Sequence, residues 1–385
     1  MENVLVLVWA ALILVNMASI LLAALRLSVN GTATAAPKRD VPVSVVVPVR
    51  GIETFTRETL ANAFTIDWDS YELIFCVADA GDPVIGEIRA VSQARPDVPV
   101  RVLVGDHRIS ANPKLNNCYK GWQEARHEWV VLADSNVLMP RDYIARLFAA
   151  WRPTTGLVCS TPLGARPDGF WAEVECVFLN TLQTRWQYAG ESIGLGFAQG
   201  KSMLWNKPML DANGGIQALA AEIAEDAAAT KLVRRLGRRV HLVSSPFEQP
   251  LGRRTAEDVW SRQSRWGRLR RVTFPLFFTP EILMGALPPL LVGLCVAAVT
   301  EVDMASIAIT TLVAIYLPEI LLAYARNWHL SIMTLPAMIV RDMMIPAVWF
   351  RSWMQKPVEW RGNTMAIGTR FSELKEAPTA PRCEP

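Results

Sequence analysis

Two aspartates in this chain of 385 residues follow short apolar runs, in a pattern that suits ligand binding. Asp79 lies in CVADAGDP (76–83), and Asp134 lies in ADSN (133–136). Such runs are typical of buried strands, and the carboxyl ends of parallel strands share one edge of a sheet. One such aspartate alone is as readily a turn cap. Two on one rim favour a site for a divalent metal or for sugar hydroxyls.

The segment NPKLNN (112–117) places Lys114 at the start of an expected helix, 114–126. A cation is badly placed at the positive end of a helix dipole unless an anion binds there. Lys114 is therefore a candidate anion ligand, and the alternative is a solvated surface lysine.

The segment AEDAAATKLVRRLG (224–237) predicts a helix that begins near Asp226 and is ended by Gly237. An acid in the first turn of a helix is ordinary dipole compensation. The same placement keeps a carboxylate ionised, so Asp226 also suits the role of a base. The local sequence leaves both interpretations open.

The segment RQSRW (262–266) places Arg262 and Arg265 on one face of a helix, with Trp266 beside them. Two guanidinium groups that converge on one point suit a diphosphate, because each presents paired donors. The alternative is a juxtamembrane basic helix attracted to anionic lipid.

The elements that must position these residues alternate between strand and helix. This alternation predicts an α/β domain with a mostly parallel sheet over residues 42–272. The expected strands are 43–51, 71–79, 100–105 and 129–133, and the expected helices between them are 58–64, 83–94 and 114–126.

Apolar segments on both sides of this domain predict membrane attachment. Residues 1–27 form an expected uncleaved anchor, and the basic residues after it place the domain on the cytoplasmic side. In 273–350 we expect two spans and a re-entrant or interfacial segment, 329–350, because Arg341 and Asp342 fall inside the latter. The remaining parts are a linker, 28–41, and a cytoplasmic tail, 351–385.

The net charge and the cysteine spacing argue against several other classes of protein. The net charge of +3 is too small to predict nucleic-acid binding, and the six cysteines have neither zinc-site spacing nor a disulfide pattern. The sequence does not predict the oligomeric state.

Taken together and in order, these motifs resemble membrane glycosyltransferases of family 2 and, more closely, the ceramide glucosyltransferases of family 21. The shared pattern comprises CV-x-D-x-x-DP, NPK-[IL]-NN, D-S-x, Gly-Gly followed by AED, and [QR]-x-x-RW. The corresponding segments here are 76–83, 112–117, 134–136, 214–215 with 224–226, and 262–266. The resemblance extends over roughly residues 1–365.

The resemblance implies a GT-A nucleotide-sugar-binding fold and assigns roles to individual residues. Asp226 would be the catalytic base, and Asp134 with Asn136 would hold a divalent cation, Mg²⁺ or Mn²⁺, on the donor diphosphate. Asn136 departs from the second carboxylate of many family 2 enzymes, which weakens the metal prediction. Substrate-binding roles would fall to Asp79 at the uridine, and to Asp82, Lys114, Asp134, Arg262, Arg265 and Trp266.

The implied reaction is inverting transfer of glucose from UDP-glucose to the primary hydroxyl of ceramide. One alternative is transfer of a hexose or N-acetylhexosamine from a UDP-sugar to another lipid, such as a hopanoid or diacylglycerol. Another is a non-catalytic, membrane-anchored protein that binds nucleotide or lipid. The implied partners are a UDP-sugar, a membrane lipid and the bilayer, which would be the inner membrane in a bacterium.

Overall fold

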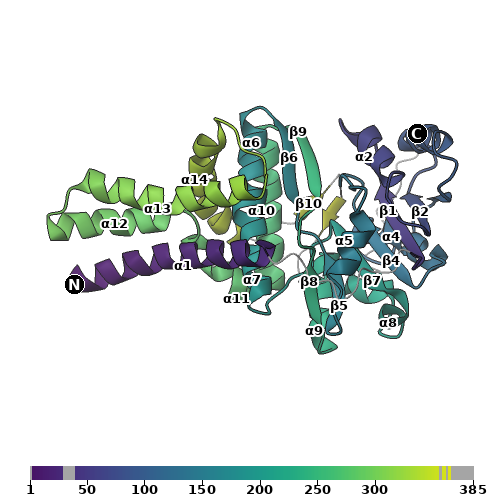
Figure 1. Cartoon of the computed structure of the whole chain (residues 1–385), viewed down its shortest axis with the longest axis horizontal. Helices are drawn as coiled ribbons and strands as arrows, with labels where there is room; N and C mark the ends of the chain where they lie inside the picture. The colour runs from purple at the N-terminus through teal and green to yellow at the C-terminus, as the bar shows by residue number, and fades with distance from the viewer. Residues whose placement is uncertain (1, 29–39, 355–357, 361–362, 366–385) are drawn as a thin grey trace, which may run out of the picture.

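The computed structural model describes residues 2–28, 40–354, 358–360 and 363–365. The expected linker, 28–41, and the expected tail, 351–385, lie largely outside these residues. An α/β body forms one end of the molecule, and long helices extend from it at the other end (Figure 1).

The central sheet has seven strands in the order β3-β2-β1-β4-β7-β5-β8. Four of its strand pairs are parallel, and β7 is antiparallel to both of its neighbours. The expected α/β fold with a mostly parallel sheet is confirmed. The strands are β1 (Val43–Val49), β2 (Tyr71–Val77), β3 (Val100–Val104), β4 (Trp129–Ala133), β5 (Thr155–Cys159), β7 (Ser202–Asn206) and β8 (Arg239–Leu242).

Both faces of this sheet are covered, which explains its continuous apolar strands. Val46 and Ile74 belong to one core cluster, whereas Val45 and Leu73 belong to another, because successive side chains of a strand point to opposite faces. The helices of this body are α2 (Thr56–Ala63), α3 (Val84–Gln93), α4 (Pro113–Glu124), α5 (Tyr143–Ala149), α8 (Lys207–Asp211), η2 (Ile216–Ala221) and α9 (Glu225–Arg235).

A second layer of helices lies between the sheet and the extension (Figure 1). It packs beside a small parallel sheet of β6 (Leu163–Asp168) and β9 (Glu248–Arg253). A further short pair, β10 (Val358–Trp360) and β11 (Asn363–Met365), is antiparallel. The helices of the layer are α6 (Phe170–Val177), the π-helical segment η1 (Phe178–Thr184), α7 (Arg185–Ser192) and α10 (Ala256–Thr273).

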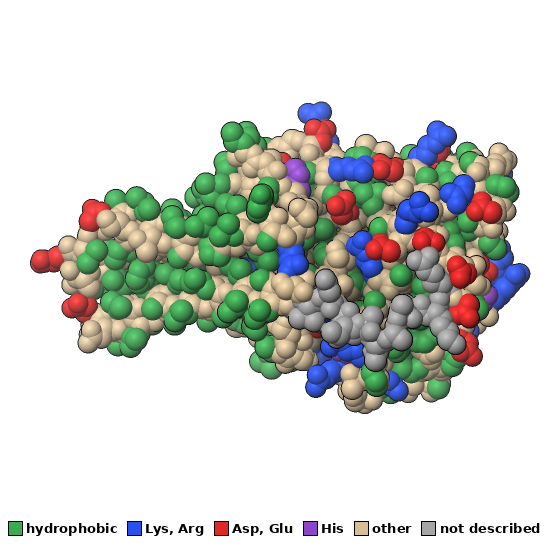
Figure 2. All heavy atoms as spheres, viewed as in Figure 1, with side chains coloured by type: hydrophobic (Ala, Val, Ile, Leu, Met, Phe, Trp, Pro, Cys, Tyr) green, Lys and Arg blue, Asp and Glu red, His purple; other side chains and the backbone are tan. Residues whose placement is uncertain are grey.

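The extension consists of α1 (Glu2–Ser28), α12 (Leu287–Thr300) and α13 (Met304–Ala325) (Figure 1). Hydrophobic side chains dominate its visible surface, whereas charged side chains gather on the α/β body (Figure 2). By length and composition α1 and α13 could cross a membrane. Within the described residues the candidates number three if α12 and the segment before it, bent by 45°, form one span. That preceding segment comprises α11 (Pro275–Phe278) and η3 (Thr279–Leu283).

The last long helix, α14 (Thr334–Trp353), buries the two charged residues that interrupt its apolar sequence. Arg341 lies 2.7 Å from Asp342 and 2.8 Å from Glu319 of α13, all three being at most 3% exposed. Arg185 of α7 lies 3.3 Å from the same glutamate. The charges therefore compensate one another inside the bundle instead of facing lipid. The interfacial placement of residues 329–350 stays a prediction.

Candidate active site

A cavity of about 1240 Å³ extends from the rim of the sheet to the helices of the second layer and the extension. Strand β4, the start of α9, and helix α10 contribute its polar wall. All the predicted site residues except Asp79 and Asp82 line it, namely Lys114, Asp134, Asn136, Asp226, Arg262, Arg265 and Trp266.

At the floor of the cavity Asp134 is held between two lysines. One carboxylate oxygen lies 2.6 Å from Nζ of Lys114, and the other lies 2.9 Å from Nζ of Lys201. Lys201 also donates to the amide oxygen of Asn136 at 3.2 Å. Lys114 further contacts Glu225, at 2.7 Å. A cation at the start of a helix needs an anion nearby. For Lys114 the carboxylates of Asp134 and Glu225 supply that negative charge.

These contacts give the cluster a strong electrostatic preference. Burial favours the neutral form of Asp134, but Lys114 and Lys201 outweigh it and lower the pKa of this carboxyl to about 2. Burial likewise opposes the charge of Lys114, but Asp134 and Glu225 outweigh it and raise its pKa. Both groups therefore stay charged at neutral pH.

The predicted metal ligands, Asp134 and Asn136, do not fit a divalent cation in this arrangement. The oxygens that would coordinate the cation accept hydrogen bonds from lysine ammonium groups. An ammonium within hydrogen-bond distance of the same oxygens repels a second cation. Within the residues that the structure describes, no group of three or more His, Cys, Asp or Glu side chains could hold a metal ion.

The asparagines of NPKLNN build the loop that presents Lys114. Asn112 caps α4 by accepting from the backbone N–H of Lys114 at 2.9 Å, and its amide donates to Glu225 at 2.6 Å. Asn116 accepts from the backbone N–H of Ser110 at 2.8 Å. Asn116 thus braces the loop, whereas Asn112 and Lys114 both line the cavity and both contact Glu225.

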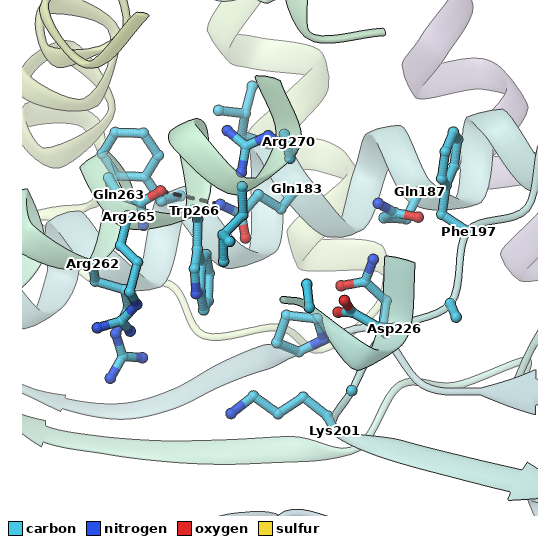
Figure 3. Close-up of a pocket in the computed structure, with 18 of the residues that line it drawn as sticks. Gln183, Gln187, Phe197, Lys201, Asp226, Arg262, Gln263, Arg265, Trp266 and Arg270 are labelled. Atoms are coloured by element: carbon cyan, nitrogen blue, oxygen red, sulfur yellow. Dashed lines mark hydrogen bonds between the residues drawn. The ribbon is translucent and has the colours of Figure 1, made fainter. Parts of the chain in front are cut away.

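Asp226 lies at the N-terminal turn of α9, above Lys201 in the view of the cavity (Figure 3). The backbone N–H of Ala227 donates to its carboxylate at 2.8 Å. Burial raises the pKa of Asp226 to about 7, and the negative charge of Glu225 adds to the rise. A carboxyl with this pKa can accept a proton near neutral pH, which suits a general base.

Helix α10 presents the arginines and the tryptophan of RQSRW to the same cavity (Figure 3). Arg262 lies 2.5 Å from Glu175, which is fully buried, and 5.7 Å from the ring of Trp266. Glu175 also pairs with Arg254 at 3.3 Å. This buried carboxylate fixes the guanidinium of Arg262 at the cavity wall. A capping box at Thr255 starts the helix.

Asp79 and Asp82 lie on the same rim of the sheet but outside the cavity lining. Exposed Asp79 accepts from the backbone N–H of Gly81 at 2.9 Å, as in a turn. Asp82 accepts from the backbone N–H of Gly51 at 2.9 Å and of Val84 at 3.0 Å. It therefore braces a loop that does line the cavity, because Gly51 is part of the lining. Nucleotide contacts by either aspartate stay predictions.

The other end of the cavity is apolar and reaches the helices of the extension. The aromatic ring of Phe197 lies 5.0 Å from the ring of Phe274, which lies between α10 and α11, and 5.0 Å from the ring of Phe277 in α11. Other apolar residues come from α1 and α14. The apolar lining includes Val15, Ala18, Leu22, Ile193, Leu195, Phe278, Ile345, Val348 and Trp349.

A family model described as Glycosyl transferase family 21 matches residues 11–371. The chain belongs to this family. As a family 21 glycosyltransferase it is 25% identical over 335 residues to ceramide glucosyltransferase 3 of Caenorhabditis elegans, covering 84% of this chain and 72% of that protein. Ceramide glucosyltransferase 1 of the same organism is 27% identical over 243 residues, which is 63% of this chain and 52% of the relative.

Among solved structures, the glycosyltransferase is similar to the mannosyltransferase PcManGT from Pyrobaculum calidifontis in complex with GDP-Man and Mn²⁺. The TM-score is 0.48 at 18% identity, over 88% of this chain and 99% of that one. The sheet described above and the family membership agree with the expected GT-A-like fold.

Three charged residues that build this cluster of ion pairs were not predicted from the sequence. Lys201, Glu225 and Glu175 make the ion pairs that fix Asp134, Lys114 and Arg262, respectively. Glu225 precedes Asp226 in the motif AED, so its place in the sequence offered a signal. Lys201 and Glu175 lie in segments without a comparable pattern and reach the site through the tertiary fold.

Proposed function

We propose that this chain catalyses inverting transfer of glucose from UDP-glucose to the primary hydroxyl of ceramide, giving glucosylceramide. Membership of family 21 and the similarity to ceramide glucosyltransferases support the reaction class. Glucose and ceramide are the finer parts of the proposal, because the identity to those relatives is about a quarter.

The observation that carries the proposal is one cavity with two chemically different ends. The charged end, with Lys114, Lys201 and Arg262, suits the diphosphate of a nucleotide sugar. The apolar end, with Phe277 and Trp349, suits the chains of a lipid. Transfer between a polar donor and a lipid acceptor needs such a junction.

In the proposed reaction Asp226 accepts the proton of the acceptor hydroxyl while its oxygen attacks the anomeric carbon. The bond from that carbon to the diphosphate oxygen breaks, and the electron pair leaves with UDP. The cations at the charged end stabilise the added negative charge on the leaving group. A general base of this kind contributes typically ~10²–10⁴-fold to the rate. Arg265 and Trp266 would close the donor side, with Asp79 and Asp82 at the nucleoside.

Membrane attachment brings the apolar end of the cavity to its lipid substrate. We propose that α1 and α13 cross the bilayer and that the α/β body lies on the cytoplasmic face, where basic residues following the first span favour it. Protease protection in sealed vesicles tests this orientation, and a body protected from a protease added on the cytoplasmic side would contradict it.

The divalent cation predicted from the sequence, Mg²⁺ or Mn²⁺, would have to displace Lys201 from Asp134 and Asn136. The proposed reaction therefore includes no step that depends on a cation. Activity measured before and after chelation tests the cation prediction directly.

The full-length protein in lipid nanodiscs, with UDP-glucose and a panel of lipid acceptors, tests the function by mass spectrometry of the products. Glucosylceramide is the expected product with the wild type, and Asp226→Asn should reduce its formation ~10²–10⁴-fold. If a hopanoid or diacylglycerol is glycosylated and ceramide is not, the alternative of transfer to a lipid other than ceramide would be favoured. If the Asp226→Asn variant keeps full activity, the assignment of Asp226 as the catalytic base is wrong.

A further inference from the structure

The structure places Lys201 where the sequence predicts a metal ion. Its ammonium group lies 2.9 Å from Asp134 and 3.2 Å from Asn136, the two residues expected to ligate the cation. The side chain is 16% exposed and lines the cavity, so its charge faces the proposed donor site. Figure 3 shows it on the cavity floor beneath Asp226.

The backbone fixes Lys201 in this position. The residue directly precedes β7, whose antiparallel pairing with β4 sets Ser202 opposite Ala133. The backbone N–H of Asp134 donates to the carbonyl of Lys201 at 2.9 Å. Lysine and aspartate are thus joined through both main chain and side chain.

The preceding residue, Gly200, packs closely against the side chains of this cluster. A Cβ atom at Gly200 would lie 2.7 Å from a carboxylate oxygen of Glu225 and 3.0 Å from Nζ of Lys114. The carbonyl of Gly200 also accepts a hydrogen bond from Lys114. The close approach of backbone to side chains therefore builds Lys201 into a preorganised cluster.

The surrounding charges favour an anion beside Lys201. Lys201 and Arg262 are both positively charged and both line the cavity, and buried Glu175 holds the guanidinium of Arg262 at the cavity wall. Lys201 and Arg262 therefore repel each other across the cavity. An anion bound between them relieves that repulsion, and a diphosphate accepts hydrogen bonds from both.

We propose that Lys201 takes the place of a divalent cation at Asp134 and Asn136 and binds the diphosphate of the nucleotide-sugar donor directly. The proposal rests on the proposed function for the identity of the donor. During transfer the anomeric carbon gains a bond to the acceptor oxygen and loses its bond to the diphosphate. The ammonium of Lys201 keeps its proton throughout and neutralises the charge that develops on departing UDP.

The first test measures nucleotide binding to the full-length protein by calorimetry, with and without EDTA. Wild-type affinity for UDP should be unchanged by chelation, and Lys201→Met should weaken it about tenfold to a hundredfold. Affinity for uridine, which lacks the diphosphate, should not change. Lys207→Met is the matched control, because Lys207 lies on α8 outside the cavity and pairs with Asp211. Equal losses for UDP and uridine would indicate only a structural role and overturn the proposal.

The second test measures lipid glycosylation by the same proteins. Metal-free wild type should keep its activity, Lys201→Met should lose it, and Lys201→Arg should recover part of it because the positive charge returns. Wild-type activity that disappears with EDTA and returns with Mn²⁺ would overturn the proposal while leaving the transferase function intact. Metal-free UDP binding that depends on Lys201, without transfer to any lipid, would instead refute the proposed function alone.

Discussion

Replacing Asp226 with asparagine should stabilise the protein at alkaline pH while it removes activity. The side chain lies at the wall of the cavity, where burial and Glu225 raise its pKa from 3.8 to about 7. The folded state therefore binds the Asp226 proton more tightly than the unfolded state does. Between pH values of about 4 and 7 the free energy of unfolding falls as the pH rises, because the carboxyl ionises in the unfolded state but stays protonated in the folded state; above 7 the full cost is present.

The size of the effect follows from the shift. A rise from 3.8 to about 7 corresponds to about 4 kcal/mol at ~1.4 kcal/mol for each pKa unit. Water in the cavity screens part of this cost, so we expect a gain on the order of 2 kcal/mol for Asp226→Asn above pH 7. In a chain of 385 residues, with an unfolding entropy of ~2.1 cal/mol/K per residue, that gain raises the melting temperature by about 2–3 °C. The gain should vanish near pH 4.

Thermal unfolding followed by tryptophan fluorescence from pH 4 to 9 measures this difference. Asp168→Asn provides the matched control, because Asp168 is exposed at the end of β6, outside the cavity lining. In parallel, wild-type kcat/KM should rise with pH through about 7 as Asp226 ionises. A stability difference between Asp226→Asn and wild type that stays constant over this range would refute the raised pKa and the assignment built on it.

Three further substitutions test the fold and the acceptor end. Glu319→Gln should cost ~3–5 kcal/mol in unfolding measurements, because it removes the carboxylate that pairs with buried Arg185 and one of the two that pair with buried Arg341. Gly121→Ala should cost ~1–3 kcal/mol in the same assay, since its Cβ would lie 2.4 Å from a methyl group of Val46. Phe277→Ser should raise KM for the lipid roughly tenfold in steady-state kinetics, through lost apolar contact, and leave UDP affinity unchanged.

The parts of the fold that the sequence predicts well are those determined by local patterns. Strand β4 begins and ends as expected at Trp129 and Ala133, because its apolar run is bounded by polar residues on both sides. Helices α4 and α9 are also recovered to within a few residues, since Asn112 and Gly237 supply start and stop signals. The placement of Asp79 and Asp134 on one rim also follows from the sequence, because parallel strands end at the same edge of the sheet.

The interactions that define the site depend on contacts between distant segments. Lys201 reaches Asp134 only because β7 pairs antiparallel with β4, which no local pattern in β7 indicates. Likewise, Arg341 and Asp342 suggested costly charges in a membrane segment. In the structure Glu319, on another helix, completes their compensation. A single sequence reveals the charges but not their partners.

Helix α10 connects the two chemistries of the proposed site. Its Arg262 faces the charged end of the cavity, and its C-cap residue, Phe274, forms part of the apolar end. Close contact with α14 holds the helix, because a Cβ atom at Gly267 would lie 2.4 Å from the hydroxyl of Ser352. Because one helix positions residues at both ends, a shift of α10 at the apolar end would also move Arg262 at the charged end. In the proposed reaction, this shared helix would link binding of the lipid to the placement of positive charge around the leaving group.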